Sequence, residues 1–157
     1  MKKYFILLVF FGCISSFAQK KGLLLKTYTF KEVEKKMKQT PKPIVVFNYT
    51  DWCKICFGMK QTTFNNSNVI ALLNKHFYFI KLNGEEKKDI RFLGNIFKYL
   101  PSGSNTGVHE LTKALATNHK KIAYPTTTIL NSNLEIDAQL VGFYNSKKFR
   151  KVLEKLL

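Results

Sequence analysis

The chain has 157 residues and a formal net charge of +16, from 26 lysine and arginine residues against 10 aspartate and glutamate residues. This length suits one domain with a single hydrophobic core. The basic residues are spread along the sequence in short clusters rather than gathered in one stripe. This scattered distribution argues against nucleic-acid binding and indicates a solvated basic surface.

The first residues have the pattern of a secretory signal peptide. Lys2-Lys3 precedes an apolar run over residues 4–11 that is too short to cross a bilayer as a helix. Small residues precede a cleavage site after Ala18, so we expect a signal peptide over 1–18 and one domain over 19–157. This pattern predicts a protein of the periplasm, or a secreted one.

Gly12-Cys13 allows a second interpretation of the same segment. A Gly-Cys pair after an apolar run is similar to a bacterial lipoprotein box, in which the protein is anchored through a lipidated Cys13. Beyond this segment, the sequence has no apolar stretch long enough to predict a transmembrane helix in the mature chain.

The first half of the domain predicts alternating helices and strands. Thr29 and Glu32 form a capping-box pattern, and an unbroken apolar run follows Pro43, as in a strand buried on both faces. The sequence therefore predicts, in chain order, a helix over about 30–38, a strand over 44–49, a helix through 57–62, a helix capped near 66–68, and a strand over 77–82.

The second half begins with an unusual stretch over about 84–121. Gly94-Asn95 between two apolar segments predicts a hairpin, and the residues after it predict a loop and then a helix. The expected elements are hairpin strands over 90–93 and 96–99, a loop over 101–107, a helix over 108–117, strands over 126–130 and 134–136, and a last helix capped by Ser146.

Without Cys13, the domain has two cysteines, Cys53 and Cys56, at the junction between a strand and a helix. A disulfide that closes so short a loop contributes little to stability, so the pair indicates redox chemistry or metal binding. A helix N-terminus stabilises a thiolate on Cys53, and Lys54 adds positive charge that tunes its pKa. Cys56 is then placed to resolve a mixed disulfide on Cys53.

The segments Trp52-Cys53-Lys54-Ile55-Cys56 and Tyr124-Pro125-Thr126 resemble the thioredoxin superfamily. The insertion, including Gly107 to Leu111, is similar to that of exported thioredoxin-like proteins common in Bacteroidota. The resemblance implies an α/β, thioredoxin-like three-layer fold. In it, a central mixed sheet is flanked by helices, and a hairpin-plus-helix insertion precedes the strand after a cis-proline, Pro125.

The resemblance also implies roles for residues around the dithiol. Pro125 is expected beside the two cysteines, with the backbone of Tyr124 free to pair with an extended substrate segment. Trp52 is expected to pack beside the site and shape the substrate groove. These three residues are the candidate substrate-binding residues.

Two features of the sequence depart from the thioredoxin pattern, at Phe47 and at the Lys54-Ile55 dipeptide. Phe47 stands where thioredoxins have a buried aspartate, which puts fast thioredoxin-like proton transfer in doubt. His109 and Glu110 are a candidate replacement acid–base pair, if the inserted helix folds over the dithiol. The Lys-Ile dipeptide replaces the Gly-Pro of thioredoxin, so the potential of that protein cannot be carried over.

These features predict an exported thiol-disulfide oxidoreductase without a cofactor, exchanging disulfides with protein substrates and served by an upstream membrane redox partner. By family analogy we expect a reductase and a monomer. One alternative is a copper- or zinc-binding protein that uses the cysteine pair and one histidine, from His76, His109 or His119. The other is a non-catalytic binding module with a fixed disulfide.

Overall fold

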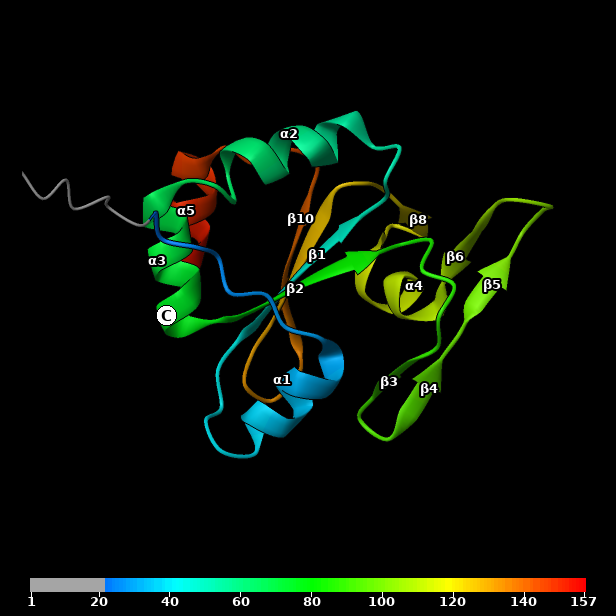
Figure 1. Cartoon of the computed structure of the whole chain (residues 1–157), viewed down its shortest axis with the longest axis horizontal. Helices are drawn as coiled ribbons and strands as arrows, with labels where there is room; N and C mark the ends of the chain where they lie inside the picture. Colours follow the sequence, from blue (N-terminus) through cyan, green and yellow to red (C-terminus); the bar gives the residue numbers. More distant parts are fainter. Residues whose placement is uncertain (1–21) are drawn as a thin grey trace, which may run out of the picture.

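A four-stranded mixed sheet lies at the centre of the computed structural model, which describes residues 22–157 (Figure 1). The strand order is β10 (Ile136–Val141), β9 (Thr126–Leu130), β1 (Ile44–Tyr49) and β2 (Tyr78–Asn83). Strand β1 pairs in parallel with β2 and antiparallel with β9, and β9 pairs antiparallel with β10. The fully apolar start of β1 is explained by this central position, which buries both faces of the strand.

Helices cover both faces of the sheet and give a three-layer α/β fold (Figure 1). One face packs against α2 (Lys54–Thr62), α3 (Ser67–His76) and α5 (Ser146–Lys155), and the other against α1 (Phe30–Met37) and α4 (Glu110–Ala116). Successive residues of a strand point to opposite faces, so β1 contributes to two separate hydrophobic clusters. Phe47 belongs to the cluster under α2, and Val46 belongs to the cluster under α1 and α4.

The helices begin at side chains that accept hydrogen bonds from free backbone N–H groups. The predicted capping box is present: the Thr29 hydroxyl accepts from Glu32 N–H at 3.2 Å, and a Glu32 carboxylate oxygen accepts from Thr29 N–H at 2.7 Å. The predicted cap of α5 is wrong by one residue. Asn145 accepts from Lys148 N–H at 2.9 Å, and Ser146 is the first residue of the helix.

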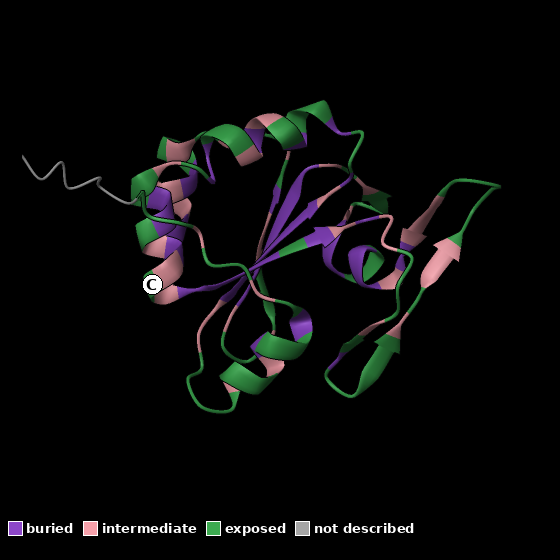
Figure 2. Ribbon diagram, in the orientation of Figure 1, coloured by how far each residue is buried: buried purple, intermediate pink, exposed green. Residues whose placement is uncertain are grey.

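The insertion is richer in strands than the sequence predicts. It contains the predicted hairpin as β3 (Ile90–Phe92) and β4 (Asn95–Phe97), but the turn is formed by Leu93 and Gly94, both with positive φ, rather than by Gly94-Asn95. The predicted loop is present over residues 102–106, but it joins the strands of a second hairpin, β5 (Tyr99–Pro101) and β6 (Gly107–His109), and β6 replaces the start of the predicted helix. Much of this insertion is exposed or half-buried in Figure 2.

Two further boundaries differ from the sequence-based expectation. The helix of the insertion, α4, begins at Glu110 and is followed by a small hairpin, β7 (Thr117–Asn118) and β8 (Lys121–Ile122). The predicted strand over 134–136 belongs mostly to a turn, because Leu134 has a φ of 68° and β10 begins only at Ile136.

The predicted signal peptide and Cys13 lie outside the described residues. Between residues 22 and 157, no helix is both long and apolar enough to cross a membrane.

Candidate functional site

The two cysteines form a disulfide at the N-terminus of α2, directly after the C-terminal end of β1. Cys53 is the N-cap residue of α2, and its sulfur accepts a hydrogen bond from the Cys56 backbone N–H at 3.1 Å. An N–H group aimed at the sulfur, together with the positive end of the helix, favours negative charge on Cys53 after reduction. The predicted position of the dithiol at a strand-to-helix junction is confirmed.

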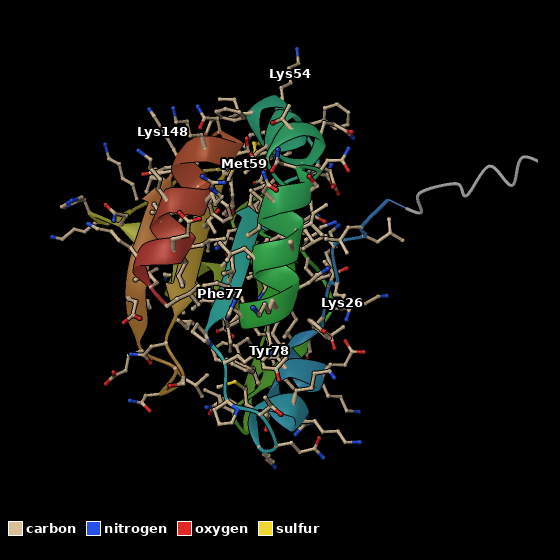
Figure 3. All side chains as sticks on the ribbon, turned by 90° about the vertical axis from the view of Figure 1, so that its left-hand side faces the viewer. Lys26, Lys54, Met59, Phe77, Tyr78 and Lys148 are labelled. Carbon is tan, nitrogen blue, oxygen red and sulfur yellow. A yellow bond between two sulfur atoms is a disulfide. The ribbon has the colours of Figure 1, made fainter. Side chains whose placement is uncertain are left out.

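Both cysteines are buried and they differ slightly: Cys53 is 6% exposed and Cys56 is 0% exposed. Because disulfide exchange requires access to a sulfur, Cys53 is the better placed of the two for attack. Lys54, the first residue of α2, extends from the molecule into solvent in Figure 3. The charge of Lys54 acts on Cys53 through the solvent, where dissolved salt screens and weakens the interaction.

Trp52 lies beside the disulfide and is 65% exposed. Its indole Nε1–H donates to a carboxylate oxygen of Glu85 at 3.0 Å, and its ring meets the Tyr124 ring edge-to-face with centroids 6.0 Å apart. These two contacts fix the orientation of a large apolar side chain at the rim of the site. Glu85 is a site residue that the sequence reasoning missed.

The peptide bond between Tyr124 and Pro125 is cis, as predicted. Pro125 is buried, and the Tyr124 ring lies tightly against Gly84, where an added Cβ would overlap the phenol. Burial, and secondarily the negative charge of Glu85, raises the pKa of the Tyr124 phenol to about 12. The phenol is therefore neutral at physiological pH, and the cis-proline segment is held next to Trp52.

Aromatic side chains fill the space beneath the dithiol. Phe47 is fully buried in the same hydrophobic cluster as Cys53 and Cys56, which confirms an apolar residue at this position. The Tyr49 ring stacks on Phe47 with centroids 5.8 Å apart. The Lys60 ammonium nitrogen lies 3.3 Å from the centroid of the Tyr49 ring.

His109 and Glu110, the candidate acid–base pair, lie at the start of α4. The Nδ1 atom of the fully buried His109 accepts from Leu111 N–H at 3.2 Å and caps the helix. A Glu110 carboxylate oxygen accepts from Lys98 N–H at 2.7 Å. Both interactions lie within the insertion, and α4 packs on the face of the sheet opposite α2. An acid–base role for this pair stays a prediction.

The structure separates the histidines named as candidate metal ligands. His76 ends α3, His109 caps α4, and His119 lies in the turn between β7 and β8. Across residues 22–157, no three histidine, cysteine, aspartate or glutamate side chains gather closely enough to hold a metal ion. The metal-binding alternative therefore lacks, in this part of the chain, the ligand set that it requires.

Comparison with known proteins agrees with this fold. A family model described as a thioredoxin-like domain matches residues 30–157. Among solved structures, a thioredoxin from Thermus thermophilus has 17% sequence identity and a TM-score of 0.59, over 83% of this chain and 85% of that chain. A DsbH oxidoreductase has 19% identity and a TM-score of 0.57, over 85% of each chain.

A putative disulphide-isomerase from Bacteroides thetaiotaomicron is also similar, with 26% identity and a TM-score of 0.56, over 87% of this chain and 94% of that chain. No curated protein matches the sequence. The family model covers most of the chain, and the solved structures are similar in fold over most of their length. The chain therefore belongs to the thioredoxin-like family.

Proposed function

We propose that this protein is a thiol-disulfide oxidoreductase whose reactive pair is Cys53 and Cys56, with protein thiols and disulfides as substrates. The observation that carries the proposal is the disulfide at the N-terminus of α2, in which Cys53 caps the helix and keeps slight exposure while Cys56 is fully buried. In this arrangement the Cys53 thiolate attacks a substrate disulfide, and Cys56 then attacks the mixed disulfide and releases the reduced substrate. No cofactor is needed for this exchange.

An apolar surface around the dithiol supports a protein as the substrate. Three large side chains near the cysteines are more than half exposed: Trp52 at 65%, Ile55 at 56% and Phe57 at 62%. Exposed apolar side chains in one place are typical of protein-binding surfaces. A substrate segment that packs on this surface would cover both the apolar side chains and the disulfide.

The backbone of Tyr124 offers hydrogen bonds to such a segment. Within the described chain, neither its N–H nor its carbonyl group takes part in a backbone hydrogen bond of the protein. Unpaired backbone groups at the edge of a site can bind an extended peptide in the manner of an added strand. With Trp52 opposite, they define the two sides of the proposed substrate groove.

The finer parts of the proposal concern location and direction. The charge and hydropathy pattern of residues 1–18 supports export, so we expect a periplasmic or secreted monomer that receives electrons from a membrane partner. An oxidoreductase and a putative disulphide-isomerase among the similar structures are consistent with thiol chemistry in this fold. We propose the reductase direction, on analogy with exported thioredoxin-like proteins.

The reduction potential of the Cys53–Cys56 couple tests this function. The protein is equilibrated with dithiothreitol or glutathione buffers, and the fraction of free thiol is measured by alkylation, with Cys53→Ser as the control. A potential near that of thioredoxin, about −270 mV, supports a reductase, whereas about −120 mV would indicate an oxidant. A pair that reacts with neither buffer would overturn the enzyme proposal and favour a binding module with a fixed disulfide.

A further inference from the structure

Lys60 lies on the face of α2 that carries the buried cysteine. It follows Cys56 by four residues, so the two side chains are neighbours one helical turn apart. Side chains on a helix lean toward its N-terminus, so we expect the long side chain of Lys60 to extend toward the end of α2 that carries the dithiol. Lys60 is half-buried rather than exposed, although lysine normally extends into water.

Contacts with β1 hold the amine in this place. The ammonium nitrogen lies 3.3 Å from the centroid of the Tyr49 ring, close enough for a cation–π interaction. Tyr49 stacks on Phe47, and Phe47 packs in the same cluster as both cysteines. A positive charge is therefore held at the margin of the apolar cluster that contains the Cys56 sulfur.

The resolving step creates a negative charge on a fully buried side chain. Cys56 is fully buried, and the other members of its cluster are apolar. A thiolate that forms in such surroundings is costly unless an opposite charge or hydrogen bonds compensate for the loss of water. Phe47 supplies neither, whereas Lys60 is a cation held at the edge of the cluster.

We propose that the Lys60 ammonium is the counter-charge that stabilises the Cys56 thiolate during resolution of the mixed disulfide. The role rests on the proposed function. The Cys56 S–H bond breaks and its proton passes to solvent; the thiolate electron pair forms the Cys53–Cys56 bond. The bond between Cys53 and the substrate sulfur breaks, and that sulfur leaves with its electron pair and takes a proton from solvent. Lys60 keeps its proton throughout.

The groups around Lys60 agree with an electrostatic role. Burial lowers the pKa of its ammonium, while Asp51 raises it and Lys81 lowers it. Asp51 is itself held by a hydrogen bond from the Asn83 side-chain amide at 3.0 Å. Burial is also the main cause of the raised pKa of Tyr49, so the phenol beside Lys60 is neutral when the thiolate forms.

The test measures the ionisation of Cys56 directly. In a chain with Cys13→Ser and Cys53→Ser, Cys56 is the single remaining thiol, and its thiolate absorbance is followed against pH. We expect Lys60→Gln to raise the pKa of Cys56 by about one pH unit, because an opposite charge nearby favours the thiolate. Lys60→Arg, which keeps the charge, is expected to restore most of the original pKa.

Lys148→Gln is the matched control, since it removes the same charge from an exposed position on α5. It should leave the pKa of Cys56 unchanged. With both active cysteines present, a small aromatic disulfide releases one thiol on attack by Cys53 and a second on resolution. Lys60→Gln is expected to slow the second release by about threefold to fourfold at neutral pH, because the smaller thiolate fraction is partly offset by higher nucleophilicity.

Two results would overturn the inference: an unchanged pKa of Cys56 in Lys60→Gln, or an equal change in Lys148→Gln, which would reflect net charge alone. Failure of Lys60→Arg to restore the pKa would also count against it, since the charge would then not be the cause. The titration of Cys56 does not depend on catalytic activity. The absence of a reversible couple in the wild-type protein would refute the proposed function, and this titration would still report on Lys60 separately.

Discussion

Replacing Gly84 with alanine should destabilise the protein, because the added methyl group would overlap Tyr124, which lines the cis-proline side of the site. A Cβ on Gly84 would overlap the hydroxyl oxygen and two ring carbons of Tyr124. The ring cannot shift freely, because it also meets Trp52 edge-to-face. Overpacking of this kind costs about 1–3 kcal/mol, and the lower chain entropy of alanine offsets about 0.4–1 kcal/mol of it. We expect a net loss of about 1–2 kcal/mol.

Gly58 provides the matched control for the same substitution. It lies in α2, and an added Cβ would meet no atom within 4 Å. Gly58→Ala should therefore stabilise the protein by about 0.5–1 kcal/mol, the usual gain at a helical glycine. Urea unfolding of the two oxidised variants should give free energies of unfolding that move in opposite directions from wild type.

A double-mutant cycle identifies the cause of the loss. In a Tyr124→Ala background the three overlapping atoms are gone, so Gly84→Ala should cost nothing there. If Gly84→Ala is as stable as wild type, or if its penalty is the same in the Tyr124→Ala background, the packing described for this side of the site is wrong.

Three other substitutions give clear expectations. Asn145→Ala should lower the thermal midpoint, with a loss of about 1 kcal/mol for the α5 cap, whereas Ser146→Ala should be nearly neutral; equal effects would refute the assigned cap. Glu85→Gln removes a negative charge that raises the pKa of Tyr124, so alkaline ultraviolet titration should show this pKa falling below about 12 while burial keeps it above 10. Cys56→Ser should leave a long-lived mixed disulfide with a substrate thiol, detectable by mass spectrometry; rapid release without Cys56 would contradict its resolving role.

Three strands of the central sheet, β1, β2 and β9, could be predicted from the sequence because their signals are local, whereas the edge strand β10 was misplaced. The apolar run of β1 and the capping box of α1 each lie within a few residues, and the structure confirms both. The insertion could not be predicted in the same way, since its strands have only two or three residues, too few to show a period. Pairing of β5 with β6 depends on the close approach of Gly107 to the Tyr99 ring, which no local pattern encodes.

The same distinction between local and non-local signals applies to the residues of the site. Cys53, Cys56 and Pro125 belong to short motifs, so their roles could be proposed before the fold was known. Glu85 follows Trp52 by 33 positions, and only the parallel pairing of β1 with β2 brings the regions together. Lys60 is intermediate between these cases: its four-residue spacing from Cys56 is visible in the sequence, but its contact with β1 is not.

The insertion is attached to the sheet by backbone hydrogen bonds close to its base. Gly84 donates to the Tyr49 carbonyl and accepts from His109 N–H, both at 2.7 Å. The opposite end, residues 102–106 between β5 and β6, is exposed and projects away from the sheet (Figure 1). Because the entropy of closing a loop rises only slowly with its length, we expect this tip to accept a grafted peptide. A tag placed there would tether the domain to a chosen client while leaving both termini and the dithiol unaltered.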